Sequence, residues 1–231
     1  MILSNLPQAI TAIGGLGTAA FGLLDAIKPV FPAINHTGFD RIRATIVSLT
    51  PNEPGAQPPL NALPQANVLE SLLANWINGT DLASQKSIAK SLIKLHMSAG
   101  NAPALAAATN VDPALLTQVA QSIASGTALT QQQGDAYARF DLIATAMIDE
   151  AYQHADQVYR NTTRALAAVI AVALAFAGGL SLAGTWAAFW WKPDMAIALL
   201  IGLLATPMAP IAKDISSALS AAVNTMQMVK K

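Results

Sequence analysis

Uncharged apolar stretches near both ends of the chain dominate its hydropathy pattern. The run from Ala165 to Trp191 contains no charged residue over about 27 positions, and about 20 helical residues cross the hydrocarbon core of a bilayer. Leu6 to Leu24 is likewise uncharged over about 19 residues, which is just enough to span. A third apolar stretch, Met195 to Ala212, follows the turn at residues 192–194. The pattern predicts three transmembrane helices, of which the last two form a hairpin.

Charged and aromatic residues stand at the two edges of the second apolar run. Arg160 and Arg164 precede it, and Trp186, Trp190 and Trp191 lie at its end. Basic and aromatic side chains concentrate where a membrane helix meets its two interfaces. We therefore predict that these five residues are interface anchors.

The first predicted span is rich in small residues. Two stripes at four-residue spacing run along it, Gly14-Thr18-Gly22 and Thr11-Gly15-Ala19. Small residues allow helix backbones to approach closely, which is how membrane helices associate. We predict that Gly14, Gly15, Thr18 and Gly22 are contact residues. Packing within the chain, a subunit contact and a pore-lining wall are all compatible with the stripes.

Between the spans, apolar residues recur at helical spacing. Residues 39–49 predict a short amphipathic helix at the membrane surface or on a domain. The following residues, 50–64, carry prolines at 51, 54, 58, 59 and 64, a density that excludes a helix or a central strand and predicts a linker. No stretch keeps a period of two with β-branched residues, so the pattern predicts no sheet.

Helix caps divide the next part, residues 64–129, into a small soluble helical domain. One helix is predicted from about Gln65 to Ile77, closed by a glycine at 79. Asp81 is placed to cap a second helix, whose predicted buried stripe includes Leu95. Asp112, followed by a proline, caps a further helix that Gly126 ends.

Thr130 starts a predicted helix that runs into the second span. Small and apolar residues follow it at alternating four and three spacing, as in a coiled-coil seam. We predict that Ala144, Met147 and Ala151 on this seam make helix-packing or oligomer contacts. The predicted helix acts as a stalk that continues into the membrane.

The predicted organisation thus has five segments. They are a transmembrane helix (1–32), a surface amphipathic helix with the Pro-rich linker (33–63), the soluble domain (64–129), the stalk continuing into transmembrane helix 2 (130–191), and transmembrane helix 3 with an amphipathic tail (192–231). The fold class is all-α, an integral membrane protein with three transmembrane helices. Its small cytoplasmic helical domain is inserted between helix 1 and the C-terminal hairpin.

Composition narrows the chemistry. Hydrophobic residues make up 53% of the chain and charged residues 11%, against about 25% charged in ordinary soluble domains. The formal net charge is zero, so no basic field suggests a nucleic-acid partner. There is no cysteine, which excludes disulfides and thiolate metal sites.

Catalytic and metal-binding groupings are not predicted. Glu150 and His154 share one helix face, but a metal site needs three or more converging ligands. Neither a phosphate-binding glycine loop nor a nucleophile-elbow pattern occurs in the sequence. We therefore expect no enzyme activity, no cofactor and no bound metal.

Basic residues predict an orientation. With three spans, Arg41, Arg43, Arg160 and Arg164 fall on one side together with the basic residues near the C-terminus, and Lys192 falls opposite. Since Lys and Arg concentrate in cytoplasmic loops, the middle domain and the C-terminus should be cytoplasmic and the N-terminus outside.

Two passages carry a resemblance to known proteins. They are Arg139-Phe140-Asp141 … Met147-Ile148-Asp149 … Tyr159-Arg160 … Arg164 and the glycine-rich Gly15-Leu16-Gly17-Thr18-Ala19-Ala20-Phe21-Gly22-Leu23-Leu24-Asp25. The chain resembles uncharacterised bacterial inner-membrane proteins in which a stalk helix leads into a C-terminal transmembrane hairpin. The resemblance implies a bacterial source and the inner (plasma) membrane, and it implies no activity.

These features together predict a structural role. We expect a self-assembling or complex-anchoring membrane subunit, or scaffold, whose partners are the lipid bilayer and either further copies of itself or a larger complex. The alternative is a passive oligomeric channel lined by the Gly/Thr-rich N-terminal helix.

Overall fold

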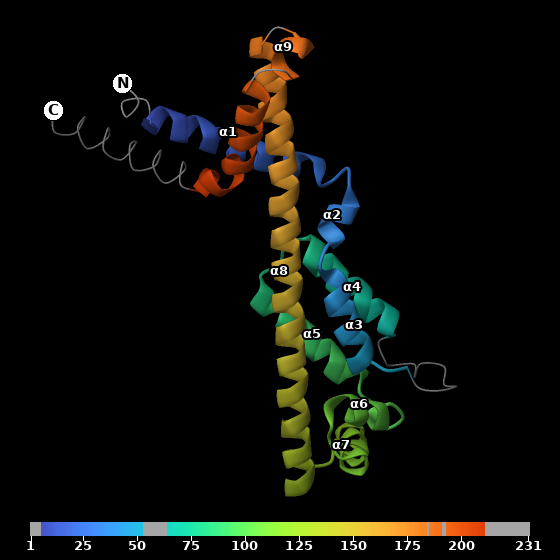
Figure 1. Cartoon of the computed structure of the whole chain (residues 1–231). Helices are drawn as coiled ribbons and strands as arrows, with labels where there is room; N and C mark the ends of the chain where they lie inside the picture. Colours follow the sequence, from blue (N-terminus) through green and yellow to red (C-terminus); the bar gives the residue numbers. More distant parts are fainter. Residues whose placement is uncertain (1–5, 53–63, 184, 191–192, 211–231) are drawn as a thin grey trace, which may run out of the picture. The chain divides into compact units, whose positions relative to one another are not determined.

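The computed structural model describes residues 6–52, 64–183, 185–190 and 193–210, which form helices joined by turns with no strand among them (Figure 1). The helices are α1 (Leu6–Ile27), α2 (Pro32–His36), α3 (Phe39–Leu49), α4 (Gln65–Ile77), α5 (Leu82–His96), α6 (Ala102–Thr109), α7 (Pro113–Ser125), α8 (Gln131–Ala183) and α9 (Trp186–Trp190). A further apolar helix covers Asp194–Pro210. The all-α prediction is confirmed for the described residues. Most of the Pro-rich linker and the predicted C-terminal tail lie outside them.

The chain divides into two compact units. One, here called the helical domain, comprises Asn35–Tyr159; the other, here called the apolar unit, comprises Met1–Ile34 and Arg160–Lys231. Helix α8 belongs to both, because it continues through Tyr159 and Arg160 without a break. Residues 35–52 and the start of α8 share the helical domain with α4 to α7.

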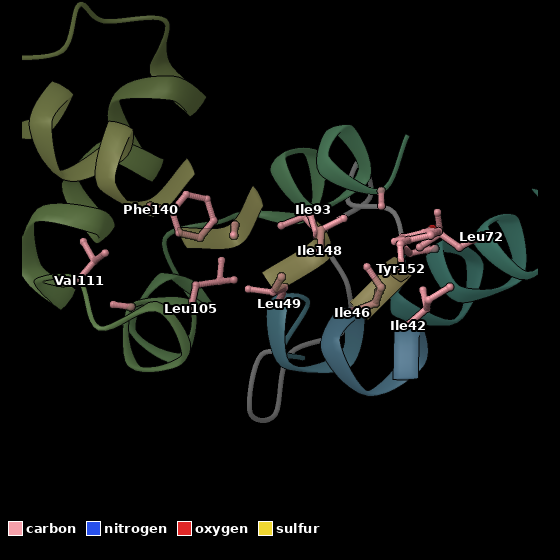
Figure 2. Packing of buried hydrophobic residues seen from close by; sticks show 14 of the residues in the cluster. Ile42, Ile46, Leu49, Leu72, Ile93, Leu105, Val111, Phe140, Ile148 and Tyr152 are labelled. Atoms are coloured by element: carbon pink, nitrogen blue, oxygen red, sulfur yellow. The ribbon is translucent and has the colours of Figure 1, made fainter. Parts of the chain in front are cut away.

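The helical domain is built around one hydrophobic cluster. Figure 2 shows Ile42, Ile46 and Leu49 of α3, Leu72 of α4, Ile93 of α5 and Leu105 of α6, together with Phe140, Ile148 and Tyr152 of α8. The amphipathic pattern of residues 39–49 is confirmed as a helix, and its apolar face enters this cluster. Burying four large side chains of one short helix, each worth about 1.5–3 kcal/mol, makes α3 part of the domain core.

Local capping chemistry sets the helix ends. The side chains of Asp81 and Asp112 accept hydrogen bonds from Ser84 N and Leu115 N, each at 2.9 Å, as the two predicted N-caps require. Gly126 ends α7 in the left-handed conformation. These three predictions are confirmed.

A reciprocal capping box starts the longest helix. Gln133 N donates to Thr130 Oγ1 at 3.3 Å, and Thr130 N donates to Gln133 Oε1 at 2.9 Å. Two of the backbone donors at the helix start are thereby satisfied. From there α8 extends for 53 residues and continues past Gly178 and Gly179.

One glycine allows α3 to approach α8 closely. Gly38, at the N-cap of α3, has φ +90°, and a Cβ there would overlap the backbone carbonyl of Ala155. Residues that carry a Cβ are strained at such a φ. Both conditions require glycine at this position.

Side-chain hydrogen bonds attach the ends of the helices to neighbouring backbone. Trp76 Nε1 donates to Asn35 O at 3.0 Å, and Gln65 Nε2 donates to Thr50 O at 2.6 Å. His96 Nε2 lies 3.1 Å from Pro51 O. The two ends of the 51–64 segment are therefore both held against the domain.

The buried stripe of α5 differs from the one expected. Its buried residues are Gln85, Ala89, Ile93 and His96, whereas Leu95 is 68% exposed. The prediction for Leu95 was wrong: the buried positions follow one helix face at spacings of four, four and three, and Leu95 lies off that face.

Candidate functional site

The close packing of small residues in the apolar unit is the candidate functional site. On α1 the buried positions are Gly14, Gly17, Ala20 and Leu24, a stripe at spacings of three, three and four that follows one helix face. A Cβ added to Gly17 would overlap the backbone carbonyl of Ala205 in the helix Asp194–Pro210. Gly17 therefore allows two backbones to touch.

The same kind of contact recurs between α8 and the returning helix. A Cβ on Gly202 would lie 2.5 Å from Val172 Cα, and one on Gly179 would lie 2.7 Å from Cε2 of Phe189 in α9. Ala20, Ala171 and Ala205 form a small cluster in which each side chain is fully buried. Three apolar helices thus meet through glycine and alanine.

The predicted contact residues of α1 fall on two faces. Gly14 is buried, while Gly15, Thr18 and Gly22 are exposed. A Cβ on Gly15 or on Gly22 would meet no atom within 4 Å, and Thr18 Oγ1 donates to Gly14 O at 3.0 Å. The sequence analysis missed Gly17, because it followed stripes of spacing four; the combination of three and four residues was the available signal.

The seam residues of α8 lie in the helical domain. Ala144 and Ala151 are buried, and Met147 packs partly buried against the hydrophobic cluster. Side chains of their own chain cover Ala144 and Ala151 here, so these residues contribute to packing within the protomer.

The predicted anchors occupy exposed positions. Arg160 and Arg164 are exposed on α8. Trp186 and Trp190 of α9 are 64% and 51% exposed, and their rings stack at 6.4 Å between centroids. Trp191 lies outside the described residues. Two stacked indoles open to the surroundings are the arrangement that membrane interfaces favour.

A lysine ladder joins α5 to α8 in the helical domain. Lys86 Nζ lies 2.7 Å from Asp149, and Lys90 and Lys94 lie 2.7 and 2.8 Å from the two oxygens of Asp141. Lys94 Nζ also sits 5.4 Å from the ring centroid of Tyr137. The partners lie more than forty residues apart in the sequence, so the sequence gave no signal for these pairs.

These ion pairs shift the pKa values of Asp141 and Lys94. Partial burial alone would raise the pKa of Asp141, but hydrogen bonds from Lys90 and Lys94 outweigh it and hold the pKa below its ordinary value. The hydrogen bond to Asp141 raises the pKa of Lys94. Asp141 and Lys94 are therefore both charged at neutral pH.

Buried polar atoms do not form a chemical site. Burial raises the pKa of the Tyr152 hydroxyl, and this oxygen, like His154 Nδ1, has no hydrogen-bond partner among the described residues. The described part of the chain also shows no group of three or more His, Asp or Glu side chains placed to hold a metal ion. The arrangement offers packing surfaces and a charged helix pair.

Comparison of the chain with protein-family models, with curated proteins and with solved structures finds no match.

Proposed function

We propose that this chain is an integral membrane protein with three spanning helices, in the inner membrane of a bacterium. One observation carries the membrane location. In the most apolar 18-residue stretch of α8 only 11% of the residues are buried, and in the corresponding stretch of α1 only 22% are. An apolar helix inside a soluble protein buries its side chains, because exposed apolar area costs about 25 cal/mol per Å² in water. A helix that is apolar on all sides and uncovered fits a lipid environment.

The third span rests on the helix Asp194–Pro210. Its large side chains are turned outward, among them Leu199, Leu200, Leu203 and Leu204, while Ala198, Gly202 and Ala205 face inward. That division suits a helix packed on one side and in lipid on the other.

The helical domain then lies on the cytoplasmic side. Arg41, Arg43, Arg160 and Arg164 are all exposed, and with three spans they share one side of the membrane. The positive-inside rule makes that side cytoplasmic.

Topology can be tested directly because the chain has no cysteine. A membrane-impermeant maleimide added to intact cells should label Lys192→Cys, between the second and third proposed spans. Glu150→Cys, in the helical domain, should react only after the cells are opened. Labelling of both from the same side would contradict the three-span arrangement. Release of the protein by alkaline carbonate would contradict membrane insertion itself.

Within the membrane, we propose a structural role as a self-assembling or complex-anchoring subunit. The support is the second face of α1. Gly14 and Gly17 pack inside the chain, whereas Gly15 and Gly22, seven residues apart on one face, have open space beside them. Small residues at this period let two helices pack.

Native mass spectrometry in a mild detergent tests this role. Replacing Gly22 by Leu should shift the assembly toward the single chain, whereas Gly134→Leu, also in open space but in the helical domain, should leave the mass unchanged. A wild-type protein that is strictly monomeric and co-purifies with nothing would remove this proposal.

A passive channel is the second candidate. It is favoured by hydroxyls on the exposed side of α1, where Thr11 and Thr18 stand near Gly15. In planar bilayers Thr18→Leu should then change the single-channel conductance. A wild-type protein without conductance ends this alternative.

A further inference from the structure

The apolar unit contains a cavity of about 700 Å³ between α1, the end of α8 and the helix Asp194–Pro210. Small residues create it: Ala9 and Ala12 line one wall, and Ala175 and Gly178 line another. A Cβ on Gly178 would meet no atom within 4 Å. The volume lies within the range of about 300–1,000 Å³ found for small-molecule sites.

The length of the cavity matches one leaflet of a bilayer. Its lining on α8 extends from Leu174 to Ala183, about 14 Å at 1.5 Å per residue. Half of the hydrocarbon core is about 15 Å. An extended acyl chain that reaches from the interface toward the membrane centre therefore has the right length.

One carboxyl group marks the polar end. Among the described residues that line the cavity, Asp194 is the only ionisable one. It is half-buried and has no hydrogen bond or ion pair with another described residue. It stands at the first residue of its helix, close in sequence to the exposed indole of Trp190. An amphiphile here would place its head group against a carboxyl group.

The charge of the head group decides which amphiphile fits beside Asp194. A fatty acid or an anionic phospholipid would bring a second negative charge next to Asp194, which is unfavourable in a partly desolvated site. An ammonium group would instead pair with it and donate hydrogen bonds.

We propose that this cavity holds one acyl chain of an amine-bearing phospholipid whose ammonium group pairs with Asp194. The inference rests on the membrane location proposed above and names the ligand of the apolar unit.

The test uses the full chain reconstituted in vesicles of equal parts phosphatidylethanolamine and phosphatidylglycerol. After extraction in mild detergent, native mass spectrometry should show one phosphatidylethanolamine retained in preference. Ala175→Leu fills the cavity and should lower its occupancy about tenfold. Ala173→Leu is the matched control, because it adds the same side chain two residues away at an exposed position outside the lining, and it should retain the lipid.

Two further variants separate packing from charge. Gly178→Leu enters open space and should reproduce the loss, which keeps the test decisive if Ala175→Leu does not fold, as judged by circular dichroism. Asp194→Asn should keep a bound lipid but lower the preference for the amine head group about threefold, as expected for one partly exposed ion pair.

Retention that is equal in the filled and control variants, a preference for phosphatidylglycerol, or no retained lipid would each overturn the inference. Carbonate extraction of the wild type separates this failure from that of the proposed function. A chain that stays in the membrane without retaining lipid contradicts only the cavity proposal, whereas a chain released by carbonate contradicts both.

Discussion

The two halves of α8 pack in opposite ways. In the helical domain the helix buries large side chains, Phe140 and Tyr152 among them, and pairs its aspartates with lysines of α5. In the apolar unit it buries only alanines, at 167 and 171, while Leu182 is 91% exposed. The first half gains stability by removing apolar area from water. The second half leaves its large apolar side chains uncovered and contacts its neighbours through small residues, which let helix backbones approach closely.

Removing a large side chain should therefore break the first half most. Phe140→Ala removes a fully buried ring and should destabilise the helical domain by about 4 kcal/mol, through lost burial and a residual cavity. Hydrogen exchange followed by mass spectrometry on the full chain in detergent should show lost protection in α3 to α7. Leu142→Ala, at a 70% exposed position two residues away, is the control and should have little effect.

Adding even one methyl group should disrupt the close packing of the apolar unit to which the second half of α8 belongs. Gly17→Ala places a Cβ against the carbonyl of Ala205, and the backbones must separate at a cost of about 3 kcal/mol. Gly134→Ala in α8 is the control because its Cβ also meets nothing. Because alanine has a higher helix propensity than glycine, stability should rise in this control by up to about 1 kcal/mol.

Thermal unfolding in mild detergent compares this pair of variants. The melting temperature should fall for Gly17→Ala and stay level or rise for Gly134→Ala. Equal shifts in the two variants would mean that close approach at Gly17 contributes nothing.

The ion pairs of the first half should have a moderate effect that depends on pH. The pKa of Asp141 is lowered in the folded chain, so its stabilisation is present above its unfolded pKa of about 3.9 and is lost as pH falls through the folded value. Since these side chains are partly exposed, solvent screening limits the contribution to about 1 kcal/mol.

Asp141→Asn should remove that contribution at pH 7, and the difference from wild type should vanish at acid pH. Urea unfolding at both pH values measures it. Asp135→Asn, at an exposed position without a lysine partner among the described residues, serves as the control. A difference between Asp141→Asn and wild type that stays the same at low pH would contradict the assignment.

The smallest effect is expected at Tyr152. Its hydroxyl is buried without a hydrogen-bond partner among the described residues, so Tyr152→Phe removes an unfavourable desolvation and keeps the ring. Stability should be unchanged or rise by about 1 kcal/mol. Equilibrium unfolding in urea measures this change, and a clear loss of stability would show that the hydroxyl has a partner.

The sequence predicted the local features of this fold well, for identifiable reasons. The caps at Asp81 and Asp112 and the start of α8 near Thr130 all depend on backbone donors that side chains a few residues away satisfy. Such interactions are contained in a short stretch of chain. The candidate site was predicted only in kind: small residues on α1 were expected to pack, but Gly17 was not among those named.

What the sequence by itself determined is where helices form, where they end, and which stretches are apolar enough to cross a membrane. Tertiary structure alone decided which face of α1 packs, because a 3.6-residue period makes several stripes of small residues overlap and only the shape of the partner helix selects one. It also decided that α3 enters a core and that Lys90 meets Asp141. Contacts of that kind join residues distant along the chain, and their energies exist only once the helices are placed together.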